Sequence, residues 1–405
     1  MLFSEVIGHE EVKQHLTEMV QHNRLSHALL FLGKEGNGTL PLALAFAQYV
    51  VSLPAVKEKV MAADLFGGFS AIETEEPTTD TVLLPDQIAE LPAYLRATQL
   101  IHPDLHFSYP VVTKKPGDKP TSADYLSEWR EFIKLYPYGN VYDWLQFIGA
   151  ENRQGNITAE ECNDIIRKLN LKSFESAYKV LVMWMPEYLG KEGNKLLKLI
   201  EEPPANTLFI LVAENEEQIL PTILSRCQLV KVPALEQDVI AGALVARAQV
   251  EPARASQIAA IADGNYREAL QLMQHAEEDW QSLLREWLNA TLRNGPVAQI
   301  KFTEEISKLG REKQKQFLKY FVHLIEQSIR IRIMGPERVQ MADHEKDFAQ
   351  RINKIASVSQ QEAMATALDK AAYYVERNAN AKMLFQALTI RLYHIIQHKT
   401  LILAQ

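Results

Sequence analysis

The stretch Gly33-Lys34-Glu35-Gly36-Asn37-Gly38-Thr39-Leu40, "GKEGNGTL", decides how the amino-terminal part of the chain is interpreted. It follows the apolar run "ALLFL" and precedes "PLALAFAQYVV", so its glycines stand between an expected strand and an expected helix. A phosphate-binding loop reads G-x-x-x-x-G-K-[ST], where the lysine reaches the phosphates and the hydroxyl group ligates Mg²⁺. Thr39 and Leu40 occupy those last two positions here. The sequence therefore predicts the backbone of such a loop without its chemical groups.

Buried strands predict the fold around this loop. The runs "KVLVMWM" (179–185) and "TLFILVA" (207–213) are continuously apolar, and "LSRCQLVKV" (224–232) leads into a third strand. Strands of this kind that alternate with helices indicate an open, mostly parallel sheet with helices on both faces. From about residue 235 only helical periods follow. The expected fold is therefore α/β plus all-α, with domains at 1–234, 235–276 and 277–405.

The strand at 179–185 lacks the acids that a nucleotide hydrolase needs. A P-loop ATPase places a carboxylate at the end of a second buried strand, where it helps to hold Mg²⁺. Trp184 and Met185 stand at the two positions where Asp-Glu is expected, and neither binds a hard cation. Glu187 is the acid nearby, and it is either a metal ligand or a cap. Four positions thus lack the expected residue: Thr39 and Leu40 in the loop, and Trp184 and Met185 at the strand end. Together they predict a site without catalysis, whereas the loop alone also fits a glycine-rich turn of an unrelated domain.

Composition excludes several classes of protein. The net charge of −8 over 405 residues argues against a chain that coats nucleic acid by itself. Cys162 and Cys227 are the two cysteines, which fits a reducing compartment and leaves too few thiols for a structural zinc site. The stretch "MLFSEVIGHEEVKQH" lacks a continuous apolar core, and the apolar run 40–56 is interrupted by polar residues and prolines. We expect a cytoplasmic protein with no membrane contact.

A stretch rich in aromatic residues, about 115–150, interrupts the α/β pattern within an insert of about 115–157. One interpretation is a helical hairpin whose aromatic side chains form a small core of their own. The other is a surface to which a partner docks. The aromatic residues are Tyr125, Trp129, Phe132, Tyr136, Tyr138, Tyr142, Trp144 and Phe147.

Several phrases together resemble the clamp-loader branch of the AAA+ ATPases. They are "HALLFLGKEGNGT", "NKLLKLIEEPPANTLFILVAEN", "ILPTILSRCQLVKVPAL" and "DGNYREALQLM", in this order. The match covers about 1–275, and "ERNANAKMLFQAL" (376–388) resembles the collar domain of that family more weakly. The resemblance implies an AAA+ parallel-sheet domain with a degenerate P-loop, a small helical lid domain and a helical collar for oligomerisation.

The resemblance also implies roles for single residues. Arg226, in Ser225-Arg226-Cys227, matches the family's arginine that points across a subunit boundary at the nucleotide of the neighbour. An arginine supplied in this way is worth several powers of ten in rate. Arg267, in "GNYREAL", matches a sensor arginine of the lid, which contacts nucleotide or only holds the lid against the sheet. Asn215 falls near the first sensor position or is a strand-end cap.

Partners and cofactors follow from the same resemblance. It implies a catalytically silent subunit, in a pentamer with gamma/tau-like ATPase subunits and a delta-like subunit, that acts with the sliding clamp and primer–template DNA. Gly33, Gly36, Gly38 and Thr39 then form a nucleotide loop without function. No cofactor is expected. Two other interpretations stay open: an active P-loop ATPase or DNA motor with unusual ligands, and a generic helical scaffold.

One departure from the family concerns zinc. Its members commonly carry four zinc-binding cysteines after the P-loop helix, but this chain has no cysteine between residues 50 and 105. His102 and His106 cannot supply a tetrahedral ligand set alone. We therefore predict no bound metal.

Overall fold

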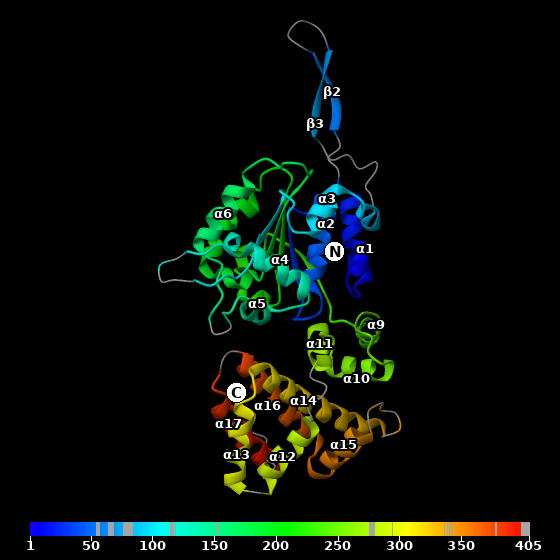
Figure 1. The fold of residues 1–405 in the computed structure, drawn as a ribbon, viewed down its shortest axis with the longest axis vertical. Helices are drawn as coiled ribbons and strands as arrows, with labels where there is room; N and C mark the ends of the chain where they lie inside the picture. Colours follow the sequence, from blue (N-terminus) through cyan, green and yellow to red (C-terminus); the bar gives the residue numbers. More distant parts are fainter. Residues whose placement is uncertain are drawn as a thin grey trace. The chain divides into compact units, whose positions relative to one another are not determined.

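The computed structural model describes two units of the chain, Met1–Ala269 and Leu270–Gln405 (Figure 1). The three domains expected from the sequence stay a prediction. The structure describes residues 1–53, 57–63, 69–75, 84–113, 117, 119–150, 153–274, 280–293, 295–335, 337, 339, 341, 343–376 and 379–397.

A five-stranded sheet organises the first unit. Its strand order is β4-β5-β6-β1-β7, and each paired neighbour is parallel. The strands are β1 (Ala28–Leu32), β4 (Leu105–Ser108), β5 (Lys179–Trp184), β6 (Thr207–Ala213) and β7 (Gln228–Lys231). The apolar runs of the sequence thus form the expected parallel sheet, which confirms the α/β part of the predicted fold class.

Helices cover both faces of this sheet (Figure 1). Side chains alternate along β1, so Leu29 and Phe31 pack into one buried cluster with α2, and Ala28 and Leu30 pack into another with α6. The α-helices of the unit are α1 (Glu10–Gln21), α2 (Thr39–Ser52), α3 (Pro92–Thr98), α4 (Leu126–Leu135), α5 (Val141–Phe147), α6 (Ala159–Leu169), α7 (Leu197–Glu201), α8 (Pro221–Leu224), α9 (Gln237–Ala248) and α10 (Pro252–Ala262).

Shorter elements complete this unit. An antiparallel pair, β2 (Lys57–Ala63) and β3 (Phe69–Glu75), occupies the region where the family resemblance would place zinc-binding cysteines. The 3-10 helices are η1 (Phe3–Glu5), η3 (Pro85–Ile88), η4 (Ser122–Tyr125), η5 (Pro186–Leu196) and η6 (Glu216–Gln218). Helix α11 (Tyr266–Gln274) crosses the division between the two units.

The aromatic insert does not form a core of its own, so that expectation was wrong. Trp129 is fully buried and stacks on Tyr109, which follows β4, with ring centroids 4.1 Å apart. It also lies 5.2 Å from the ring of Trp184 at the end of β5. The insert therefore extends the main core of the α/β unit, because its aromatic side chains pack on the residues that end two central strands.

The second unit is helical, which confirms the all-α part of the predicted fold class. Its core surrounds Trp287, whose ring centroid lies 5.6 Å from Phe302 and 5.5 Å from Phe317. The helices are α12 (Trp280–Leu292), α13 (Gly295–Ser307), α14 (Arg311–Met334), α15 (Asp343–Ile355), α16 (Val358–Glu376) and α17 (Ala381–Gln397). Among the described residues, no helix is both long enough and apolar enough to span a membrane.

Candidate functional site

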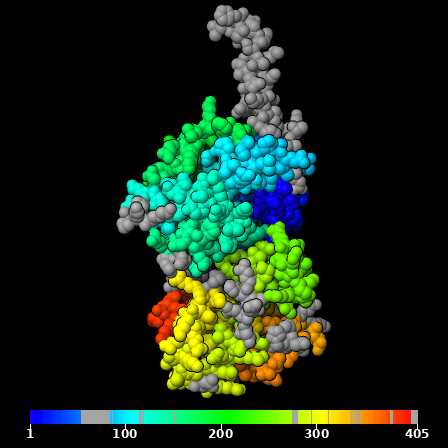
Figure 2. Space-filling model, viewed as in Figure 1, coloured from blue at the N-terminus to red at the C-terminus, as the bar shows by residue number. Residues whose placement is uncertain are grey.

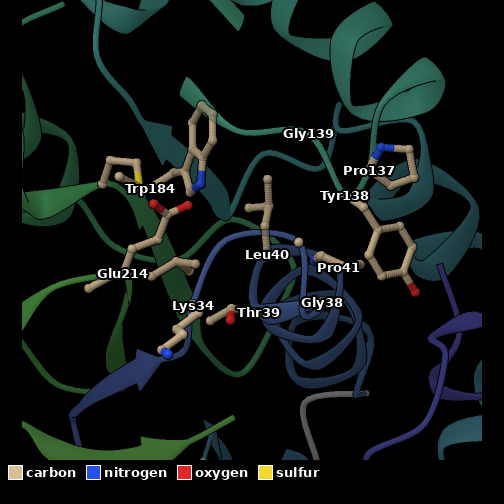
Figure 3. Close-up of a pocket in the computed structure, with 14 residues that line it drawn as sticks. Lys34, Gly38, Thr39, Leu40, Pro41, Pro137, Tyr138, Gly139, Trp184 and Glu214 are labelled. Carbon is tan, nitrogen blue, oxygen red and sulfur yellow. The ribbon is translucent and has the colours of Figure 1, made fainter. Parts of the chain in front are cut away.

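The glycine loop joins the carboxyl end of β1 to the amino end of α2, as the sequence predicted (Figure 3). Gly36 and Gly38 have φ angles of +72° and +94°. L side chains rarely adopt these angles, so the loop depends on glycine at both positions. A Cβ atom at Gly36 would also lie 1.7 Å from Oδ1 of Asn265, just before α11. The loop backbone is therefore pressed against the helical segment that carries Arg267.

Side chains of the loop fill its interior. Asn37 is 2% exposed, and its Nδ2 donates to the carbonyl oxygens of Val232, at 2.8 Å, and Pro233, at 3.1 Å. Thr39 donates from Oγ1 to Oδ1 of Asn37 over 2.8 Å. The amide and hydroxyl groups of the loop are thus satisfied within the protein, and Thr39 is held inward rather than presented to a ligand.

His9 fixes the loop from outside. Its Nε2 lies 2.6 Å from the carbonyl oxygen of Asn37. Burial lowers the pKa of His9, so its ring is neutral near pH 7 and donates to this oxygen from Nε2. Both the side chain and the carbonyl group of Asn37 are therefore bound by the protein itself.

The start of α2 is a poor site for an anion. A helix amino terminus binds phosphate through free backbone N–H groups of its first turn. Pro41, in that turn, has no N–H group. Leu40 adds an apolar side chain at the wall of the cavity (Figure 3). The helix end thus lacks one N–H donor, at Pro41, and has an apolar side chain beside it.

The cavity at the loop is small. Its volume is about 20 Å³, whereas pockets for small molecules hold about 300–1,000 Å³. Pro137, Tyr138 and Gly139 of the insert close one side of it. The segment around them forms a continuous part of the surface of the first unit in the space-filling view (Figure 2). Room for about one water molecule remains where a nucleotide would have to lie.

Trp184 and Met185 form another wall of the cavity. Trp184 is 2% exposed, and its ring lies 5.2 Å from Trp129 and 6.0 Å from Phe132. Met185 adopts a left-handed backbone conformation and donates its N–H to the carbonyl oxygen of Val212 over 2.8 Å. The position where a carboxylate would hold Mg²⁺ is therefore part of an aromatic core, in which an acid would be buried without a partner.

Glu187 and Asn215 act as caps in the structure. Oε1 of Glu187 accepts hydrogen bonds from the N–H groups of Glu214, at 2.7 Å, and Asn215, at 2.9 Å. Burial raises the pKa of Glu187. Oδ1 of Asn215 accepts from the N–H of Glu217 over 3.0 Å at the start of η6. Within the described part of the chain, no cluster of three or more His, Cys, Asp or Glu side chains could hold a metal ion.

Arg267 contacts the loop through Glu35 and the insert through Asp143. Its side chain is 4% exposed. Nε and Nη2 donate to the two oxygens of Asp143 over 2.5 and 2.6 Å, a bidentate geometry. Nη1 donates to Glu35 of the loop over 3.0 Å. Arg267 thus has the contacts of a link between the helical segment, the insert and the loop.

Arg226 lies elsewhere, just after α8. Its side chain is 30% exposed, and Nη2 forms an ion pair with Glu201 over 3.2 Å. Nη1 donates to the carbonyl oxygen of Thr222 over 2.8 Å. Arg226 is not among the residues that line the cavity at the glycine loop. The structure therefore brings the glycines, Thr39 and Arg267 together and leaves Arg226 apart from them on the surface.

The sequence did not indicate which residues close the site, although Tyr138 stands among the aromatic residues of the insert. Tyr138 covers Gly38, accepts a hydrogen bond from the N–H of Ile7 over 2.9 Å and lies 4.9 Å from the ring of Tyr266. Asp143 was not singled out either. Its capping box with Asn140 is visible in the sequence, but no local pattern links it to Arg267, which is 124 residues away.

Comparisons with known proteins show which proteins this chain is similar to. A family described as "DNA polymerase III, delta subunit" matches residues 96–236. The tau subunit of DNA polymerase III from Bacillus subtilis is 30% identical over 168 residues, which is 40% of this chain and 29% of tau. The delta' subunit from the same organism is 25% identical over 262 residues, which is 65% of this chain and 58% of delta'.

The chain resembles the clamp-loader subunits of DNA polymerase III, delta' among them. This confirms the resemblance found in the sequence. The aligned regions span less than two thirds of the tau and delta' relatives. A solved structure of a gamma subunit-related protein from Thermotoga maritima aligns with 93% of this chain and 99% of that chain, at 14% identity and a TM-score of 0.34.

The closed loop makes a prediction about stability. Replacing Asn37 with Ala should lower the free energy of unfolding by about 1–3 kcal/mol, because buried carbonyl groups and the Thr39 hydroxyl lose their partner. Urea denaturation followed by circular dichroism measures the change. Asn194→Ala is the matched control, because the amide of Asn194 donates to the carbonyl oxygen of Lys191 at an exposed site. Equal stability of the two variants would contradict a loop held closed by Asn37.

Proposed function

We propose that this chain is a delta-prime-like subunit of the bacterial clamp loader that has no ATPase activity of its own and lends Arg226 to a neighbouring ATPase subunit. In this role it assists loading of the sliding clamp on primed DNA. The single observation that carries the proposal is the closed glycine loop. Its interior is occupied by Asn37 and Thr39, and its cavity of about 20 Å³ has no room for a nucleotide.

The chemistry at the cavity wall supports the silent site. Phosphoryl transfer needs a cation held beside the phosphates and a group that orients the nucleophile. The groups at the matching positions are an indole, Trp184, and a thioether, Met185, and both are buried. Neither side chain accepts a proton or binds Mg²⁺. The wall that Trp184 and Met185 form thus supplies neither a cation ligand nor a base, and the carboxylate that lines the cavity is that of Glu214.

The surroundings of Arg226 support its proposed use in trans. An arginine stabilises the charge that develops on a transferred phosphoryl group only where it can reach that group. Arg226 is partly exposed and lies apart from the cavity of its own chain. Its ion pair with Glu201 is at the surface, where such pairs are worth little. The guanidinium group can therefore leave Glu201 at small cost when a more strongly charged phosphate approaches.

The proposed partners are gamma/tau-like ATPase subunits and a delta-like subunit in a pentamer, with the sliding clamp and primer–template DNA. A chain with a net charge of −8 would supply few of the contacts to DNA. A cytoplasmic location belongs to the same proposal. The alternative is an active P-loop ATPase or DNA motor with unusual ligands, in which Thr39 would replace the missing lysine.

The two functions differ in the activity of the isolated chain. We expect the purified chain to hydrolyse no ATP above the background of a mock preparation, and Thr39→Ala to change nothing in a steady-state phosphate-release assay. The reason is that Trp184 and Met185 stand where acids that bind Mg²⁺ would be, and that no cluster of three or more His, Cys, Asp or Glu side chains among the described residues could hold a metal ion. Turnover by the chain that Thr39→Ala abolishes would instead establish the active ATPase.

The role of Arg226 is tested in a reconstituted complex with clamp-loader subunits. Arg226→Ala should leave assembly intact and lower the ATPase rate stimulated by DNA and clamp by at least about threefold, because one neighbouring site loses its arginine. Size-exclusion chromatography checks assembly, and phosphate release gives the rate. Arg254→Ala is the matched control, since Arg254 is an exposed arginine on α10. Equal rates for the two variants would refute the role given to Arg226.

A further inference from the structure

The insert makes contacts that neither the fold nor the proposed use of Arg226 requires. Tyr138 and Asp143 lie between the glycine loop and the segment that begins α11. We propose that these two residues, with Glu35, form an internal lock that replaces a bound nucleotide. The lock holds the helical segment 237–269 in one position against the sheet, whether or not nucleotide is present.

The buried charge of Arg267 is balanced by carboxylates of the same chain. Arg267 is 4% exposed, and a guanidinium group buried to this extent needs negative partners nearby. Asp143 and Glu35 supply them at 2.5 and 3.0 Å. A phosphate group at the loop would compete with these carboxylates for the same donors. Because both partners belong to the chain itself, the position of Arg267 does not depend on a ligand.

The three charged residues belong to three different segments of the chain. Glu35 is in the glycine loop, Asp143 is in the first turn of α5, and Arg267 is in α11. The bidentate pair between Asp143 and Arg267 fixes two planar groups relative to each other, which a single point contact does not do. The pair therefore constrains the direction of α11 as well as its distance from the insert.

Uncharged contacts join the same segments. The rings of Tyr138 and Tyr266 meet edge to face with centroids 4.9 Å apart, and the hydroxyl group of Tyr138 accepts from the N–H of Ile7. The N–H of Tyr266 donates to the carbonyl oxygen of Gly36 over 2.9 Å. The start of α11 is thus joined to the loop backbone, and Tyr138 joins it to the amino-terminal segment.

Other contacts tie the same helical segment to the sheet domain. Arg247 of α9 donates to the carbonyl oxygen of Glu5. A Cβ atom at Gly8 would lie 2.9 Å from Leu235 and 3.2 Å from Val239. These contacts involve neither Glu35 nor Asp143, so loss of the two carboxylates should loosen the segment without detaching it.

Hydrogen–deuterium exchange of the full-length chain tests the lock. In the unchanged chain we expect the amides of 252–269 to be protected to the same degree with and without millimolar MgATP. In the double variant Glu35→Gln, Asp143→Asn, exchange in this segment should rise about tenfold, because the buried guanidinium group loses the charges of Glu35 and Asp143. The strands β5 and β6 should exchange as in the unchanged chain, which checks that the variant folds.

Two comparisons make the result specific. Glu175→Gln removes a carboxylate that binds Arg96 through two hydrogen bonds in the same unit, away from the segment, so it should leave exchange of 252–269 unchanged. Glu35→Gln alone retains Asp143 and should give a smaller rise, which is informative if the double variant does not fold.

Two results would overturn the lock. Exchange of 252–269 in the carboxylate variants that equals exchange in the unchanged chain would show that the carboxylates do not hold the segment. In that case the closed loop and the role of Arg226 would stand. Protection of the segment by MgATP in the unchanged chain would show that nucleotide positions it, and would contradict the silent site as well.

Discussion

The burial of one charge, the guanidinium group of Arg267, constrains most of the structure around the glycine loop. A charge that is 4% exposed is stable only with partners of opposite sign, and removal of one partner from a buried pair costs about 3–5 kcal/mol. Glu35 and Asp143 are these partners. Glu35 belongs to the glycine loop and Asp143 to the insert, so the positions of both segments are coupled to that of Arg267.

The aromatic insert accounts for the packing at the end of β5. Trp184 stands where a metal-binding acid would end β5, and its indole packs against Trp129 and Phe132 of the insert. Burial of these aromatic side chains stabilises the insert on the sheet and excludes water from the end of β5. Trp184 and the aromatic side chains of the insert therefore belong to one packing arrangement. Neither could be replaced alone by an acid or removed without leaving a buried carboxylate or a cavity.

The sequence predicted the parts of the fold that depend on local pattern. The runs 179–185 and 207–213 are buried strands, because continuous apolar segments fit a sheet that is covered on both faces. The helices after residue 235 follow from helical periodicity in the same way. The glycine loop was located correctly from its motif, and Gly36 and Gly38 have the positive φ angles for which glycine is suited.

The parts that could not be predicted depend on contacts between distant segments. Nothing near Asp143 indicates that it binds Arg267, and nothing near Asn37 indicates that its amide turns inward to Val232, 195 residues away. The aromatic residues of 125–147 were recognised, but their pattern could not show whether they pack on each other or on the sheet. The pairing was decided by the residues at the ends of β4 and β5.

Equilibrium binding of nucleotide to the intact chain tests the central claim most directly. Isothermal titration with ATP, ADP and a non-hydrolysable ATP analogue, each with Mg²⁺, measures whether the loop accepts phosphate. With Asn37, Thr39 and Tyr138 in place, we expect no saturable binding up to millimolar nucleotide. Binding of one nucleotide per chain with micromolar affinity would contradict it, because the loop would then have to open and Arg267 would have to exchange its carboxylates for phosphate.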